Sequence, residues 1–164
     1  MRIIGIDPGL SGGIAVLEDN KIKQVFDMPV MSDGKKNKRQ LNSAFLAQLI
    51  TENIKSIEDT IIVVEQVNAM PGQGVTSMFN FGQTFGAIKG ICAALRLPIF
   101  FVRPAKWKKH FELINSSKDA SRTKAIEMYP SIAEKLSKKK DVNKSDAILI
   151  ARYYSETRFK EDSK

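Results

Sequence analysis

The sequence predicts a single α/β domain built around a five-stranded mixed sheet flanked by helices. Three segments of strand length, 2–6, 13–18 and 21–27, follow one another with only tight turns between them, which predicts an antiparallel meander. Two further apolar segments, 60–64 and 99–102, each follow a stretch with helical spacing. Strands after helices favour parallel pairing. We therefore expect strands one to three to be antiparallel and strands four and five to run parallel to strand one.

The first strand ends in a carboxylate. Residues 1–13 read MRIIGIDPGLSGG, so Asp7 follows an apolar run and is followed at once by turn-forming residues. The glycines at 9, 12 and 13 would let another backbone or a phosphate come close. A simple hairpin in which Asp7 caps the turn is the alternative interpretation of this stretch alone.

The middle of the chain predicts two helices. Residues 41–57 place Leu41, Phe45, Leu49, Ile50, Ile54 and Ile57 at helical spacing, which predicts a helix with one face on a core. Segment 32–39 before it is basic and predicts an exposed loop, either a linker or a contact for a nucleic-acid backbone. A second helix is expected over 76–97, with glycines 82, 86 and 90 on one face. That face could approach the sheet or a second subunit.

The last third of the chain is rich in basic residues. Residues 103–124 interleave Lys and Arg with Trp107 and Phe111, which suits a phosphate-lined surface or a solvated helix with Trp107 in the core. A helix over 120–129 and a basic loop over 135–144 follow. Ser145 is expected to cap a last helix, with Asp146 in its first turn. We expect one domain over 1–158 and a frayed tail over 159–164.

The composition limits the classes of partner, metal site and location that the protein can have. Lys and Arg number 26 against 18 Asp and Glu, and the net charge of +8 favours a polyanionic partner. The single cysteine excludes an internal disulfide and disfavours a cysteine-based zinc site. The N-terminus lacks a signal-peptide pattern and no long apolar run occurs, so we expect a cytoplasmic protein with no membrane association.

Three acids, Asp7, Glu65 and Asp146, stand at the ends of strand one, strand four and the start of the last helix. If strands one and four are neighbours, the carboxylates can converge. Clustered carboxylates need a compensating cation, and hard oxygen ligands suit Mg²⁺ or Mn²⁺. Two such ions activate a water and stabilise the leaving oxygen of a phosphodiester. Acids in the centre of a basic protein therefore predict a nuclease.

The sequence also resembles RuvC-type Holliday junction resolvases, and in particular their small phage and bacterial members. The resemblance is carried by residues 3–16 (IIGIDPGLSGGIAV), 61–67 (IIVVEQV), 81–90 (FGQTFGAIKG), 102–109 (VRPAKWKK) and 143–151 (NKSDAILIA). These segments occur in family order and span most of the chain apart from 28–60 and the tail. The resemblance implies an RNase H-like fold.

The resemblance also implies a catalytic centre of four acidic positions that bind two divalent ions, Mg²⁺ with Mn²⁺ as a substitute. Asp7, Glu65 and Asp146 match three of these positions. The fourth falls on Asn143, whose amide oxygen can bind Mg²⁺ but which lacks the negative charge. Asp141 could complete the site instead.

For DNA contacts the resemblance implies a residue after the strand-four acid that lies against unpaired bases. This position falls near Asn68, which cannot stack, so Met70, Met78 or Phe79 could replace it, although Phe79 could equally belong to a helix core. The basic contact to the scissile phosphate falls on Lys106, with Lys118 or Arg122 as a second. Arg103, Lys108 and Lys109 are further DNA-binding candidates.

The expected function is a structure-selective DNA endonuclease that resolves Holliday junctions by paired symmetric nicks, acting as a homodimer on branched DNA, chiefly four-way junctions. A relaxed-specificity branched-DNA endonuclease and a junction-binding protein with impaired catalysis are the alternatives. An RNase H-like enzyme acting on RNA is also open. Sugar kinases and actin-like or Hsp70-like ATPases share the opening turn, but they need two such domains, which 164 residues cannot supply.

Overall fold

The computed structural model describes residues 1–34, 38–68 and 72–161. Its central sheet has five strands in the order β3-β2-β1-β6-β7. The strands are β1 (Arg2–Asp7), β2 (Gly13–Glu18), β3 (Lys21–Asp27), β6 (Thr60–Glu65) and β7 (Ile99–Val102). β1, β2 and β3 pair antiparallel, and β6 and β7 run parallel to β1, which confirms the predicted topology.

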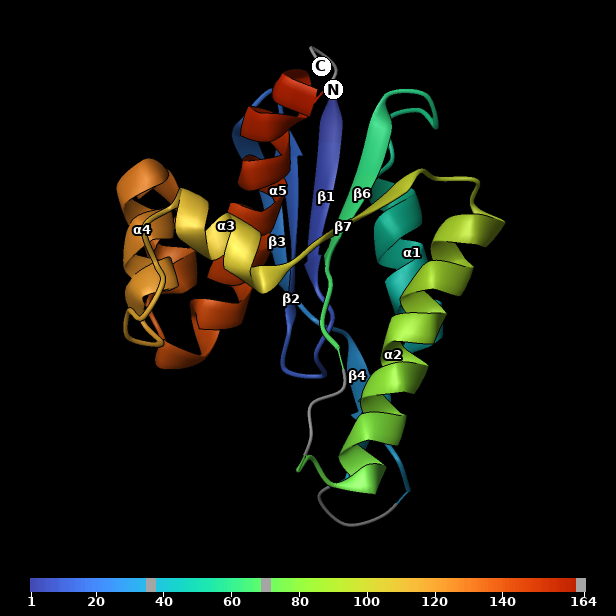
Figure 1. The fold of residues 1–164 in the computed structure, drawn as a ribbon. Coiled ribbons are helices and arrows are strands. Elements are labelled where there is room, and N and C mark those ends of the chain that lie inside the picture. Colours follow the sequence, from blue (N-terminus) through green and yellow to red (C-terminus); the bar gives the residue numbers. More distant parts are fainter. Residues whose placement is uncertain (35–37, 69–71, 162–164) are drawn as a thin grey trace.

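Helices cover both faces of this sheet (Figure 1). One face carries α3 (Pro104–His110), α4 (Ala120–Met128) and α5 (Val142–Glu161), and the other carries α1 (Ser43–Asn53) and α2 (Val75–Ala94). A hydrophobic core lies on each face of the sheet, and alternate side chains of β1 point into one or the other. Ile3 packs into the core on the α5 side, and Ile4 and Ile6 pack into the core on the α1 and α2 side. The strands β1, β2 and β6 are therefore buried on both faces, as the β-branched segment 60–64 predicts, whereas β3 and β7 at the edges of the sheet are largely exposed.

Segment 32–39 is not entirely a loop. β4 (Val30–Ser32) pairs antiparallel with β5 (Arg39–Leu41) in a separate two-stranded sheet. Residues 35–37 lie outside the described residues. The prediction of a loop was therefore wrong at both ends of the segment, whereas the described residues of the segment are exposed as expected.

The first helix is shorter than expected, because Leu41 belongs to β5 and the side chain of Asn42 caps α1 by accepting a hydrogen bond from the Phe45 backbone N–H at 3.0 Å. Leu46, Leu49 and Ile50 are its buried residues. Phe45 and Ile57, which the expected stripe placed on the core, are 46% and 44% exposed. The helix ends at Asn53 and the chain turns before Ile57, so helical spacing no longer decides where that side chain lies.

The last helix begins earlier than expected, at Val142. Ser145 is not its cap: it is the fourth residue of the helix, and its buried hydroxyl donates at 3.1 Å to the carbonyl oxygen of Asp141, the residue before the helix. The segment before it, expected to be a basic loop, contains the 3₁₀ turns Pro130–Leu136 and Lys139–Asp141. α5 is helical as far as Glu161, into the segment expected to fray, and 162–164 lie outside the described residues.

The glycine face of α2 does not pack on the sheet. A Cβ built on Gly82, Gly86 or Gly90 meets nothing within 4 Å. The buried residues of α2 are Thr84, Ile88 and Cys92, on the opposite side of the helix. Of the two partners that the sequence left open for this face, the sheet is excluded. In the described part of the chain, no helix is long and apolar enough to cross a membrane.

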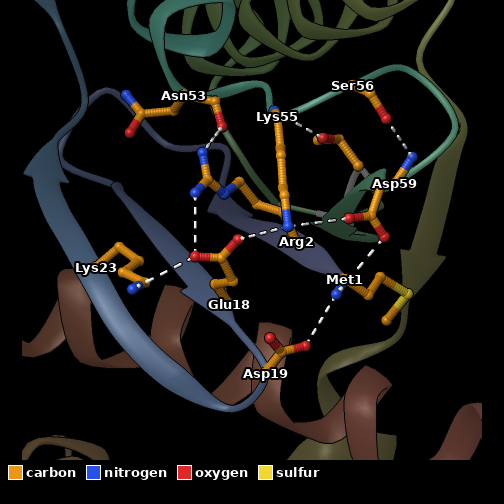
Figure 2. Close-up of polar contacts among 10 residues, drawn as sticks. Met1, Arg2, Glu18, Asp19, Lys23, Asn53, Lys55, Ser56 and Asp59 are labelled. Carbon is orange, nitrogen blue, oxygen red and sulfur yellow. Dashed lines mark hydrogen bonds and ion pairs between the residues drawn. The ribbon is translucent and has the colours of Figure 1, made fainter.

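A network of ion pairs ties together the start of β1, the end of β2 and the connection before β6 (Figure 2). Glu18 pairs with Arg2, Lys23 and Lys55, each at 3.3 Å. Its hydrogen bond to Lys55, together with those to Lys23 and Arg2, lowers the pKa of Glu18 to about 2. Because Arg2 begins β1 and Asp7 ends it, this network lies at the end of the sheet away from Asp7.

Candidate active site

Asp7 and Glu65 lie at the same edge of the sheet. Asp7 ends β1 and Glu65 ends β6, and these two strands are parallel neighbours in which Ile6 pairs with Val64. The carboxyl ends of parallel strands meet at one edge. The pairing of β1 with β6 thus brings together two acids that are far apart in the sequence.

Asp146 reaches the same place from α5, which crosses the sheet in close contact with β1 and β2. A Cβ on Gly5 would lie 2.2 Å from the Ala147 carbonyl oxygen, and one on Gly13 would lie 2.7 Å from Lys144 Cα. Only glycine permits this approach. The glycines in β1 and at the start of β2 therefore bring α5, and with it Asp146, toward Asp7.

The three carboxylates act on one another electrostatically. Burial, followed by the charges of Glu65 and Asp146, raises the pKa of Asp7 to about 7. Burial is also the main cause that raises the pKa of Asp146 to about 6, with Glu65 contributing. Burial raises the pKa of Glu65 as well, in spite of a hydrogen bond from Trp107. Among the described residues no three His, Cys, Asp or Glu side chains are arranged so that they could hold a metal ion by themselves. The three acids therefore do not enclose an ion, and we call the cluster open in this sense only.

Few groups in the described part of the chain compensate the negative charge of the three carboxylates. Lys108 lowers the pKa of all three carboxylates. The Gly9 N–H donates to Asp7 Oδ1 at 3.4 Å, and Ser121 hydrogen bonds to Asp146. Asp146 Oδ1 is buried and has no hydrogen-bond partner among the described residues. A buried carboxylate oxygen without a partner is costly unless a cation or water completes it.

A pocket of about 340 Å³ opens beside Asp146. Its lining places positively charged and hydroxyl groups, which suit an anion, beside the Asp146 carboxylate. Apart from Asp146, the polar lining residues are Lys108, Lys118, Ser116, Ser117, Ser121 and Asn143. Asn143 and Asp146 are three residues apart on α5 and therefore share a face of the helix. The earlier start of α5 thus brings Asn143 into the site.

Asp141 is engaged elsewhere. Its Oδ2 accepts from the Lys138 backbone N–H at 2.7 Å, and its Oδ1 pairs with Lys144 at 2.9 Å. Burial opposes the ionised form of Asp141, but these contacts outweigh it and lower its pKa. Asp141 is not among the charges that shift the pKa of Asp7, Glu65 or Asp146. Asn143, whose amide nitrogen donates to the Ser11 carbonyl oxygen, is therefore the better placed of the two candidates.

Two of the three candidate lysines of α3, Lys106 and Lys108, lie on different sides of the helix. Lys108 acts on the three carboxylates, whereas Lys106 lines a separate pocket with Phe100, Tyr153 and Arg158. Residues two apart on a helix are about 200° apart around its axis. The expectation that Lys106 faces the scissile phosphate is thus not supported by its position. Both lysines adjoin the buried Trp107, so no sequence signal distinguishes them.

The other DNA-binding candidates are distributed over the surface. Asn68 is exposed, and Met78 and Phe79 are 37% and 65% exposed, so Phe79 is not a core residue; Met70 lies outside the described residues. Arg103, Lys109 and Lys118 are exposed. The Arg122 guanidinium donates two hydrogen bonds to the Asp119 carboxylate, at 2.6 and 2.7 Å, and one to the Leu136 carbonyl oxygen at 3.0 Å. These bonds leave Arg122 little freedom to contact a phosphate.

Comparison with solved structures shows that this five-stranded mixed sheet flanked by helices is the RNase H-like fold of RuvC. The Thermus thermophilus RuvC structure matches with a TM-score of 0.55 and 16% identity over 96% of this chain and 97% of that one. T. thermophilus RuvC in complex with Holliday junction substrate matches with a TM-score of 0.57 and 16% identity over 96% of both chains.

A viral protein shares the fold. The fowlpox virus Holliday junction resolvase matches with a TM-score of 0.58 and 18% identity over 96% of this chain and 99% of that one. At such identities the likeness shows a common fold over almost the whole chain. No protein-family model matches the sequence, and neither does any curated protein sequence.

Proposed function

We propose that this protein is a metal-dependent DNA endonuclease that resolves four-way junctions by paired symmetric nicks. The observation that carries the proposal is the open cluster of Asp7, Glu65 and Asp146, brought together from two strands and a helix beside Lys108. The fold supports the same function, since the solved structures that share it include a resolvase and a RuvC bound to a Holliday junction.

The residues present fit divalent ions. Asp146 Oδ1 is a buried oxygen without a hydrogen-bond partner among the described residues. Burial raises the pKa of all three carboxylates, and repulsion by neighbouring carboxylates raises those of Asp7 and Asp146 further, so the cluster is costly to ionise without a cation. Mg²⁺ is usually held by one or two carboxylates together with water and substrate phosphates, not by a closed protein cage. An open cluster is suited to that mode. We propose Mg²⁺ as the natural ion, two per site, with Mn²⁺ as a substitute.

The protein's own residues would have distinct roles. The charges of both Glu65 and Asp146 raise the pKa of Asp7, so Asp7 lies near both. This position suits a ligand shared between two ions. Lys108 would hold positive charge beside the phosphate under attack, and Lys118 and Ser121 line the pocket that could receive it. When bound, a pair of Mg²⁺ ions activates a water and stabilises the leaving oxygen.

Cleavage of defined DNA substrates tests the proposal. Labelled four-way, three-way, flap and linear duplex DNA are incubated with Mg²⁺, with Asp7→Asn as the inactive control. Paired symmetric nicks in the four-way junction, and in it alone, are expected. Cleavage of every branched substrate would instead favour the relaxed-specificity nuclease, and absence of metal-dependent cleavage of any DNA would contradict both.

A junction-binding protein with impaired catalysis is the second candidate, and Asn143 favours it. The amide nitrogen of Asn143 donates to the Ser11 carbonyl oxygen, so only its neutral amide oxygen is left to contact a cation. The site has three carboxylates where four would bind two ions more tightly. Junction binding in EDTA, without cleavage at any Mg²⁺ or Mn²⁺ concentration, would support this candidate.

We further propose a homodimer that forms through the exposed face of α2. Val75 and Phe79 are 84% and 65% exposed and lie on the same side of the helix as Gly82 and Gly86, opposite the buried residues. An exposed stripe of apolar and small residues permits close approach of a second copy. Two active sites would then serve two symmetric strands.

Sedimentation of a glycine variant tests the dimer. Gly86→Glu should leave the monomer folded, because a Cβ there meets nothing within 4 Å, but it should place a charge in the interface. Gln83→Glu adds the same charge on the part of α2 that lines a pocket with Arg39 and Gln40 and is the matched control. A wild-type monomer at micromolar concentration would contradict the proposed dimer.

A further inference from the structure

The side chain of Trp107 links α3 to the candidate active site. Trp107 is the only tryptophan of the chain and is 0% exposed. Its indole Nε1 donates a hydrogen bond of 2.9 Å to Glu65 Oε1. The contact joins residues 42 positions apart in the sequence. A buried indole N–H usually donates a hydrogen bond to some acceptor. Here the acceptor is a carboxylate of the candidate active site.

The backbone holds this indole in place. β7 pairs with β6 so that Val102 lies opposite Glu65, and the Gln66 N–H donates to the Val102 carbonyl oxygen at 2.8 Å. α3 begins two residues later at Pro104, so its first turn returns Trp107 toward the end of β6. The ring is packed in the core beneath α5 with Phe111 and Leu136. The donor therefore has little freedom to move away from Glu65.

A neutral donor has a particular effect on a carboxylate ligand. The bond engages Oε1 and limits the rotation of a flexible side chain, and the second carboxylate oxygen, Oε2, can still accept another contact. The indole carries no charge, so it orients Glu65 without neutralising it. The same residue contacts the site's lysine: Lys108 Nζ lies 5.4 Å from the centre of the Trp107 ring. Trp107 thus touches both a carboxylate and the cation of the site.

We infer that Trp107 is a positioning residue that orients the Glu65 carboxylate for binding a divalent ion, and that its indole emission reports that binding directly. This inference rests on the proposed function and deepens it. Partners that orient metal ligands typically contribute about ten- to hundredfold to metal affinity.

The first experiment follows the intrinsic fluorescence of the wild-type protein during titration with Mg²⁺ or Ca²⁺ in the absence of DNA. A saturable change in emission is expected, and Glu65→Gln should abolish it. Glu18→Gln, which removes a carboxylate at the other end of the sheet, is the matched control and should titrate like the wild type. Constant emission while calorimetry detects metal binding would overturn the inference.

The second experiment replaces the donor. Trp107→Phe keeps an aromatic ring but removes the N–H. Calorimetry with Mn²⁺ should show binding about ten- to hundredfold weaker than that of the wild type, and cleavage should return at high Mn²⁺ with a similar maximal rate. Junction binding in EDTA should not change. Phe111→Leu, a substitution in the same core without a bond to the site, is the control for lost packing and should keep wild-type metal affinity.

A double-mutant cycle separates positioning from general destabilisation. If Trp107 acts through Glu65, Trp107→Phe should have no further effect on metal affinity in a Glu65→Gln background. Additive effects would overturn the inference. If Trp107→Phe does not fold, the fluorescence titration of the wild type and of Glu65→Gln still decides the matter. A wild-type protein that neither binds metal nor cleaves DNA would contradict the proposed function itself. If the wild type is active and Trp107→Phe cleaves DNA at the same rate at every metal concentration, only the role of Trp107 would be contradicted.

Discussion

Gly5 of β1 lies directly beneath Ala147 of α5, so closely that a Cβ on Gly5 would be 2.2 Å from the Ala147 carbonyl oxygen. It would also be 2.8 Å from the Ala151 Cβ. This contact is between the strand that carries Asp7 and the helix that carries Asp146. The distance between the two acids therefore depends on a position that has no side chain.

Gly5→Ala is expected to destabilise the protein and to impair the site. The backbone of α5 would have to shift, and overpacking of this kind costs about 1–3 kcal/mol. Urea unfolding should show the loss, and cleavage by the folded fraction should fall because Asp146 moves with α5. For the stability measurement alone, Gly82→Ala is the control: within the chain the added Cβ meets nothing within 4 Å, so the change should stabilise the helix by up to about 1 kcal/mol.

Lys108→Ala should reduce cleavage strongly, by about a hundredfold or more, as removal of a charge-stabilising group at a reacting centre typically does. Because Lys108 lowers the pKa of all three carboxylates, its removal should also shift the pH dependence of cleavage to higher pH. Lys106→Ala is matched in size and charge and should change the rate little. Equal losses in both variants, measured in single-turnover cleavage, would refute the distinction between the two lysines.

Stability of the metal-free protein should fall as pH rises from about 4 to about 7. The pKa of Asp7 is raised to about 7, so in this range the folded state holds a proton that the unfolded chain has released. The loss is at most about 1.4 kcal/mol for each unit by which the pKa is raised. Asp7→Asn should therefore be more stable than the wild type at pH 8 and similar to it near pH 4. Thermal unfolding in EDTA measures this difference.

Addition of Mg²⁺ to the wild type should reverse that loss. The ion competes with protons for the same carboxylates, so the gain in unfolding temperature should be large at pH 8 and small at pH 5. Asp7→Asn should show little gain at either pH. A gain of equal size at both pH values would argue against metal binding by this cluster.

Asn143→Asp should tighten metal binding, because it adds the charge that the site lacks beside Asp146. Asp141→Asn should leave metal affinity unchanged and lower stability, since the Asp141 carboxylate pairs with Lys144 and accepts from the Lys138 N–H. Calorimetry with Mn²⁺ and urea unfolding distinguish the two effects. If Asp141→Asn weakened Mn²⁺ binding as much as Asn143→Ala, Asp141 would have to be regarded as part of the site.

The sequence alone determined the sheet and its two strand-end acids. The period-two pattern, the β-branched segment 60–64 and the tight turns are local signals, and they predicted the observed pairing of β1, β2, β3, β6 and β7. Because parallel neighbours end at the same edge, that topology was enough to bring Asp7 and Glu65 together. The roles of these acids as metal ligands stay a prediction.

Only the tertiary structure decided the details that depend on contacts between distant segments. In the tertiary structure α5 begins at Val142, earlier than the sequence predicts. This start brings Asn143 into the site and leaves Asp141 paired with Lys144. The tertiary structure placed Lys108, and not Lys106, beside the carboxylates, because the side of α3 that faces them is set by how Trp107 packs on the core. It also provided the bond from Trp107 to Glu65, which no local pattern indicates because donor and acceptor meet only when β7 pairs with β6.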